Sequence, residues 1–178
     1  MSYSPQNIRN ICLLGHGGNG KTTLVESFLS LTGGSDRMGR TSEGNTVCDY
    51  DPEEIKRQIS ISAAVAPVEY NGCKINVLDT PGNFDFAGEV AECLSVADAG
   101  ILVCAAKGGL SVGTEKAWKY LQERNMPRAI YMAKIDEDGS DFHGAWQTLR
   151  EKFGRSVWPG MMPLWDEEKH VKTILDIV

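Results

Sequence analysis

Apolar residues along this chain alternate between short continuous runs and stretches with helical spacing. Continuous runs predict buried strands at residues 11–14, 64–70, 73–78, 100–106 and 129–133. Helical spacing predicts one helix after the glycine-rich residues that follow the first run, and others at residues 86–97, 114–124 and 142–153. This alternation predicts an α/β fold whose mostly parallel sheet is covered by helices on both faces.

Two connections modify this picture. Asn71-Gly72 joins the second and third runs, and both residues tolerate positive φ, so these two strands should form an antiparallel hairpin at one edge. The polar, glycine-rich residues 33–52 show no periodicity. A stretch of this length inside a compact domain predicts either a disordered segment or a functional loop.

The composition narrows the class of protein. The chain has 178 residues, 42% apolar residues and 24% charged residues, as expected of one globular domain with a sizeable core. No segment resembles a membrane span or a signal peptide, and the five scattered cysteines lack CxxC spacing, so we expect a cytoplasmic protein with no membrane contact. The net charge of −6 argues against independent nucleic-acid binding.

The first strand leads into Gly15–Thr22, a glycine-rich loop that ends where a helix begins. Glycines let backbone amides curl around a phosphate, the helix N-terminus adds partial positive charge, and the lysine reaches the β- and γ-phosphates. The pattern predicts a site for a nucleoside triphosphate. The phosphate-binding residues would be Gly15, His16, Gly17, Gly18, Asn19, Gly20, Lys21, Thr22 and Thr23.

Two further strands end in polar motifs. Asp79-Thr80-Pro81-Gly82 follows the third strand, where an aspartate can hold Mg²⁺ through water and a glycine can approach a γ-phosphate. Ala133–Asp136 follows the fifth strand, where an aspartate can accept hydrogen bonds from guanine and a lysine stem can pack on the base. By itself, the second motif is equally well explained as a solvated strand end.

Together, these motifs resemble the translational GTPases, in particular elongation factor G and its elongation-factor-G-like paralogues. The similarity extends over Cys48–Tyr50 and Arg57–Ala63, which resemble the first switch segment of that family. It also covers Phe84–Phe86 with Glu89-Val90, which resemble the second switch, and Gly108–Leu110. The resemblance implies a switch over residues 36–62 that is ordered by γ-phosphate and Mg²⁺ and released after hydrolysis.

The resemblance also implies a fold and partners. The expected fold is the three-layer, Ras-like P-loop NTPase fold, truncated before its last strand and helix. Residues 1–155 would form an incomplete GTPase domain, and residues 156–178 would begin the insert found in elongation factor G. The implied ligands are GTP or GDP and Mg²⁺, and the implied partner is the ribosome.

Roles can be carried over by position. Lys21 would hold the phosphates, Gly82 would sense the γ-phosphate, and Lys134 and Asp136 would read guanine. Mg²⁺ would be held by Thr22 and Ser60, with Asp79 acting through water. The catalytic set implied by the resemblance is Lys21, Gly82 and Asn83.

The chain departs from the family pattern at the residues that matter most. Asn83 replaces the histidine that orients the attacking water, which predicts hydrolysis slower by about 10²- to 10⁴-fold. Ala133 replaces an asparagine of the base-reading motif, which should weaken guanine binding by roughly 1–3 kcal/mol. Gly18 and Asn19 replace aspartate and alanine, and Ser60 replaces threonine while keeping the hydroxyl.

Two other functions stay open on the sequence. One is a degenerate nucleotide-sensing or ribosome-binding module with little or no turnover, which Asn83 and Ala133 would explain. The other is an ATP-using P-loop enzyme such as a kinase, because Ala133 blurs the choice of base. No lid-type arginine cluster supports this last alternative.

Overall fold

The computed structural model describes residues 3–107, 110–166 and 170–177, and the chain divides into two compact units. The first unit comprises Met1–Cys104 and Val112–Tyr131, and the second comprises Ala105–Ser111 and Met132–Val178. Gly108-Gly109, which carry part of the resemblance, lie outside the described residues.

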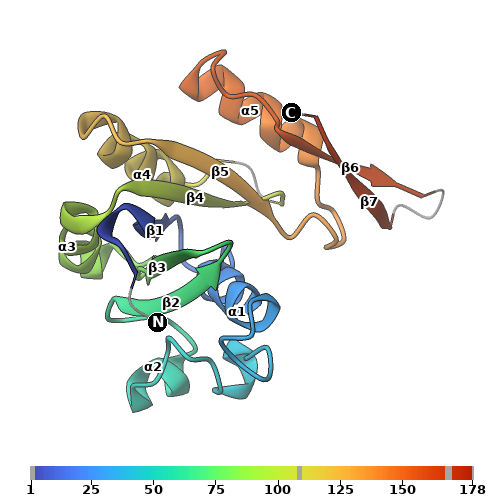
Figure 1. The fold of residues 1–178 in the computed structure, drawn as a ribbon. Helices are drawn as coiled ribbons and strands as arrows, with labels where there is room; N and C mark the ends of the chain where they lie inside the picture. The colour runs from blue at the N-terminus through green and yellow to red at the C-terminus, as the bar shows by residue number, and fades with distance from the viewer. Residues whose placement is uncertain (1–2, 108–109, 167–169, 178) are drawn as a thin grey trace. The chain divides into compact units, whose positions relative to one another are not determined.

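Five strands form one sheet in the order β2-β3-β1-β4-β5 (Figure 1). They are β1 (Ile8–Leu14), β2 (Ala64–Tyr70), β3 (Cys73–Asp79), β4 (Ala99–Ala105) and β5 (Arg128–Ala133). Strand β1 is parallel to β3 and β4, whereas β2 and β3 are antiparallel, as Asn71-Gly72 predicts. The α/β fold with an antiparallel edge is therefore confirmed.

The register of the sheet brings two motifs together. Leu13 of β1 pairs with Asp79 of β3, so the C-terminal ends of these two parallel strands lie side by side. Strand β1 lies in the middle of the sheet, and its Cys12, Leu13 and Leu14 are buried. A rigid, buried strand thus positions the glycine-rich loop beside the aspartate that follows β3.

Helices of the first unit cover this sheet. Helix α1 (Lys21–Leu31) packs against β2 and β3, whereas α3 (Ala87–Val96) packs against β1 from the other side (Figure 1). Helix α4 (Val112–Glu123) places Leu121 against Gly100 of β4, where a larger residue would clash. Short 3₁₀ turns are η1 (Pro5–Asn7), η2 (Thr41–Glu43) and η3 (Phe84–Phe86).

The polar segment between α1 and β2 is folded. It contains α2 (Pro52–Arg57), a helix that the sequence analysis did not predict. Asp51 and Glu54 form a capping box around Pro52 at the first turn, and Gln58 ends the helix with a φ of 55°. Local capping chemistry therefore produces a helix where hydrophobic periodicity gives no signal.

The second unit contains α5 (Phe142–Phe153) and a hairpin of β6 (Met161–Trp165) and β7 (Val171–Asp176). Asp141 caps α5 by accepting a hydrogen bond from the Gly144 amide. The hairpin was not predicted, because its strands are mostly exposed and lack a buried apolar run. None of the helices in the described part of the chain is long and apolar enough to cross a membrane.

Candidate functional site

The glycine-rich loop leaves the sheet where β1 ends. Gly15, Gly18 and Gly20 have φ values of 141°, 77° and 94°, a region that disfavours residues with a Cβ. A Cβ at Gly15 would also collide with the Val103 carbonyl of β4. These positions need glycine, and a turn of this kind can direct backbone amides at a phosphate.

Asn19 attaches this loop to the sheet. The β1–β4 pairing ends at Leu14 and Leu102, and the next carbonyl of β4 belongs to Val103. The Asn19 side-chain amide donates a 3.0 Å hydrogen bond to that buried carbonyl. This departure from the family pattern therefore satisfies a backbone acceptor and stiffens the loop.

Lys21 lies across the mouth of the loop and is only 6% exposed. Its Nζ donates to the carbonyls of Gly15 and His16 at 3.0 and 3.1 Å. Burial lowers the pKa of Lys21, whereas the nearby carboxylates of Asp79 and Asp49 raise it. In the described part of the chain, the hydrogen-bond acceptors of this buried ammonium are neutral carbonyls, and phosphate oxygens would be stronger acceptors for it.

Beside the loop, hydroxyls and a carboxylate converge from three elements. The Thr22 hydroxyl of α1 donates a 2.7 Å hydrogen bond to Asp79 Oδ2 and lies 3.3 Å from the Ser60 hydroxyl. Asp79 is 2% exposed, and its Oδ1 is buried without a hydrogen-bond partner in the described structure. Burial raises the pKa of Asp79 to about 6, although Thr22 and Lys21 lower it.

Asp49 joins this cluster and was not assigned a role in the sequence analysis. It is 4% exposed, and within the described residues its Oδ2 is also buried without a partner. Burial raises the pKa of Asp49, whereas a hydrogen bond from Ser60 lowers it. The motif Cys48-Asp49-Tyr50 marked the residue as part of a switch, but only the fold turns its carboxylate toward Ser60.

This cluster fits Mg²⁺. Mg²⁺ prefers oxygen ligands and is usually held by one or two carboxylates together with substrate phosphates. The described residues contain no group of three or more His, Cys, Asp or Glu side chains suited to a metal. The buried, unpartnered oxygens of Asp49 and Asp79 therefore suit a cation whose remaining ligands are hydroxyls, water and a nucleotide.

The segment after β3 touches the glycine-rich loop. A Cβ at Gly82 would collide with the backbone of Gly17 and would lie 2.6 Å from Lys21 Nζ. The Thr80 hydroxyl donates a 2.6 Å hydrogen bond to the Leu13 carbonyl, which fixes the start of the segment on β1. Gly82 is thus held next to the lysine that would bind the γ-phosphate.

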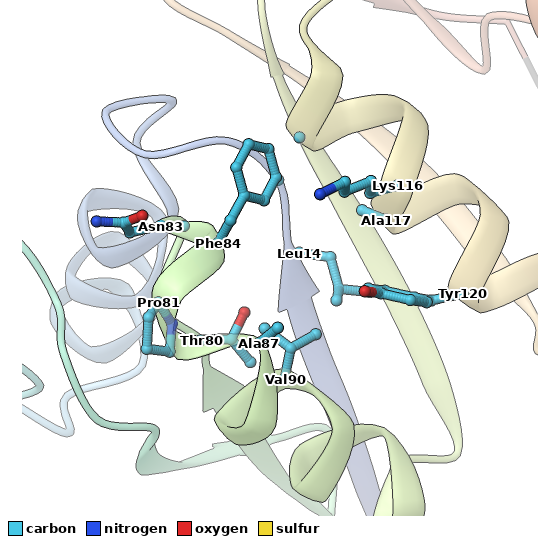
Figure 2. A pocket seen from close by; sticks show the side chains of 13 residues that line it. Leu14, Thr80, Pro81, Asn83, Phe84, Ala87, Val90, Lys116, Ala117 and Tyr120 are labelled. Atoms are coloured by element: carbon cyan, nitrogen blue, oxygen red, sulfur yellow. The ribbon is translucent and has the colours of Figure 1, made fainter.

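Asn83 is exposed, and its side chain caps the turn that follows it. Its Oδ1 accepts a 3.3 Å hydrogen bond from the Asp85 amide and caps η3. Figure 2 shows Phe84 pointing toward α4, where Lys116 Nζ lies 3.9 Å from its ring centroid, while Asn83 points away from both. The two neighbouring side chains therefore point in different directions, although both line the same pocket.

A small pocket, partly open to solvent, lies between residues 80–87 and α4 (Figure 2). Its walls are largely apolar and include Leu14, Val90 and Tyr120. Gly15 and Gly82 also line it, so the pocket adjoins the loop that would hold phosphates.

The expected base-reading residues lie in the second unit. Lys134 has a φ of 58° and pairs with Glu137 at 3.2 Å, and Asp136 is exposed. The turn is held by Ser140, whose hydroxyl donates a 2.8 Å hydrogen bond to the Ile135 carbonyl. An exposed carboxylate on an ordered turn can accept hydrogen bonds from a base, so the role of Asp136 stays a prediction.

Comparison with known proteins agrees with this architecture. The family described as "Elongation factor Tu GTP binding domain" matches residues 6–175. An "Elongation factor G-like protein" of Mycobacterium tuberculosis is 39% identical over 162 residues, which are 91% of this chain and 23% of that protein. An "Elongation factor G" of Gluconobacter oxydans is 39% identical over 171 residues, which are 96% of this chain and 24% of that protein.

A solved structure gives the same result. A protein from Thermus thermophilus superposes with a TM-score of 0.90 at 38% identity, covering 95% of this chain and 25% of that one. The chain thus spans about a quarter of the length of these relatives. The chain therefore belongs to the translational GTPase family and carries its GTP-binding domain fold.

Proposed function

We propose that this chain binds GTP and GDP together with Mg²⁺ and hydrolyses GTP slowly. The observation that carries the proposal is the convergence of Lys21, Gly82 and the Thr22–Asp79–Ser60 cluster at one end of β1 and β3. The amides of Gly15–Thr23 would surround the phosphates, and Lys134 and Asp136 would read guanine.

Each residue has a defined task in this proposal. Lys21 would exchange its two carbonyl acceptors for β- and γ-phosphate oxygens, which are charged and bind it more strongly. Thr22 and Ser60 would ligate Mg²⁺, and Asp79 would hold one of its waters. Bound Mg²⁺ would neutralise charge on the phosphates. Asp49 would add a second carboxylate beside Ser60.

Slow turnover follows from Asn83. Hydrolysis requires a water molecule in line with the bond between the γ-phosphorus and the bridging oxygen, and positioning dominates this reaction. Asn83 is short, uncharged and already bonded to the Asp85 amide. It therefore has little capacity to orient that water.

The same observation favours a second function, a nucleotide-sensing module without turnover. The alternatives separate in single-turnover assays with GTP and ribosomes, comparing the wild-type chain with Asn83→His and Asn83→Ala. Slow catalysis predicts a measurable wild-type rate that Asn83→His raises by about 10²- to 10⁴-fold. No turnover in any variant, with nucleotide bound, would establish the sensing module.

The first experiment is a titration with fluorescent GDP, GTP and ATP analogues, with and without Mg²⁺. The proposal expects Mg²⁺-sensitive binding that favours guanine over adenine. Preference for ATP would instead support the P-loop kinase alternative, and no binding at high micromolar nucleotide would contradict the nucleotide site itself.

The wider setting rests on the relatives, which are named elongation factors. We extend the proposal to action on the ribosome in translation, with residues 1–155 as the GTPase domain and residues 156–178 as the start of an insert. Cosedimentation with ribosomes in the presence of a non-hydrolysable GTP analogue tests this part separately from nucleotide binding.

A further inference from the structure

One glutamate of α2, Glu54, accepts hydrogen bonds from backbone amides on both sides of Ser60. The backbone carbonyl of Glu54 accepts a 3.2 Å hydrogen bond from the Ile59 amide, just before Ser60. The Glu54 side chain accepts from the two following amides, with Oε1 at 2.9 Å from the Ile61 nitrogen and 3.0 Å from the Ser62 nitrogen. The backbone on both sides of Ser60 is therefore tied to the same residue.

Glu54 is suited to this task by burial and charge. It is 2% exposed, and its Oε2 accepts a third hydrogen bond, at 3.1 Å, from the Asp51 amide. Hydrogen bonds from amides to a buried carboxylate are stronger than those between neutral groups, because the charge has no competing water. Glutamine cannot replace all of them, since its NH₂ group is a donor and would face an amide donor.

Ala63, which follows Ser62, is held by a glutamate of helix α3. Glu89 Oε2 of α3 accepts a 2.7 Å hydrogen bond from the Ala63 amide. Helix α3 begins directly after η3, which Asn83 caps. Two carboxylates from two helices thus hold three consecutive amides, and a displacement of α3 would pull on the segment that carries Ser60.

We propose that Glu54 is a positioning residue that holds the Ser60 hydroxyl at the Mg²⁺ site, and that Glu89 supports it from α3. The inference rests on the proposed function. It adds that the preference of the site for triphosphate over diphosphate depends on Glu54, a residue that would contact neither nucleotide nor metal. In this arrangement Ser60 reaches Mg²⁺ only when the Glu54 hydrogen bonds are intact.

A purely structural role for Glu54 predicts something different. Glu54 also closes the capping box of α2, so its loss could destabilise the segment without any effect on nucleotide choice. Such a general loss would weaken GDP and GTP binding to the same extent. Positioning of Ser60 should instead weaken binding of the triphosphate with Mg²⁺ selectively, because the first-switch hydroxyl is needed in that state.

The test compares Glu54→Gln with Glu53→Gln, a matched control on the same helix. Glu53 is exposed and pairs with Arg57 at 2.8 Å, away from the Ser60 backbone. We expect Glu54→Gln to weaken binding of a non-hydrolysable GTP analogue with Mg²⁺ by about tenfold and to change GDP binding less than twofold. Glu89→Gln, which leaves the capping box intact, should show the same selectivity with a smaller effect.

Amide hydrogen exchange of the nucleotide-free chain provides a second measurement. Glu54→Gln should accelerate exchange at Ile61 and Ser62, whereas Glu53→Gln should leave it unchanged. Equal loss of GDP and GTP-analogue binding, or unchanged exchange at both amides, would overturn the role of Glu54 while leaving the proposed function in place. Failure of the wild-type chain to bind either nucleotide would overturn the proposed function and this inference with it.

Discussion

The phosphate-binding region and the proposed base-reading turn are built in different ways. In the first unit, Lys21 and Asp79 are buried, and the glycine-rich loop is fastened to β1 and β4 by close backbone contacts. In the second unit, Asp136 is exposed and Lys134 is paired with the exposed Glu137. The proposed phosphate site is thus preorganised by the fold, whereas the proposed base reading would depend on a few solvated side chains whose replacement should cost the fold little.

The largest effect should come from Lys21→Ala. Removing the ammonium deletes charge-assisted hydrogen bonds to two phosphates, so we expect affinity for GDP and GTP to fall by about 10³-fold. Titration with fluorescent nucleotides measures this loss, and circular dichroism checks the fold. Affinity within about tenfold of wild type would show that Lys21 is not the phosphate lysine.

The next effect concerns Asp79 in the chain without nucleotide and Mg²⁺. The pKa of folded Asp79, about 6, lies above its unfolded value, so the folded chain binds more protons between roughly pH 4 and 6. The stability that Asp79 contributes is present below about pH 4 and is lost as the pH rises through 6.

Asp79→Asn removes this dependence. As the pH rises from 4 to 7, the unfolding free energy of the variant should increase by up to about 3 kcal/mol relative to that of the wild type. Denaturant unfolding at both values measures the difference, and Asp138→Asn, on the exposed turn, is the control. A difference between wild type and variant that is the same at both pH values would contradict the raised pKa.

Asp136→Asn tests the proposed base-reading turn of the second unit. We expect the ratio of GTP to ATP affinity to fall by about 30-fold, because the carboxylate that accepts from guanine is lost. The measurement is competition between the two nucleotides, and Asp138→Asn again serves as the control. An equal loss of both affinities would place Asp136 in the phosphate site or in folding, not in base reading.

Ala133→Asn should have the smallest effect. Restoring the asparagine of the family pattern would strengthen guanine binding by about tenfold if its amide finds the partner that Ala133 leaves unpaired. ATP affinity should not change, which competition assays can show. Unchanged GTP affinity would indicate that this turn does not use the asparagine.

The sequence was informative where local chemistry and periodicity agree. The loop Gly15–Thr22 was placed between a strand and a helix, and Asn71-Gly72 correctly predicted the antiparallel pair of β2 and β3. It was silent about α2 and the β6–β7 hairpin, whose residues are mostly exposed. Exposed elements carry little hydrophobic pattern, because capping or pairing stabilises them instead of burial.

Local chemistry was enough to predict the sheet, the glycine-rich loop and the family, because glycine-rich turns and apolar runs constrain the backbone over a few residues. Which polar groups meet depends on how distant segments pack together. Asp49 lies in the segment without periodicity and Glu54 directly follows it, yet folding buries both and directs them at Ser60 and at its neighbouring amides. A carboxylate acquires such a role from the desolvation and hydrogen-bond donors around it, and these are supplied by residues distant in the chain.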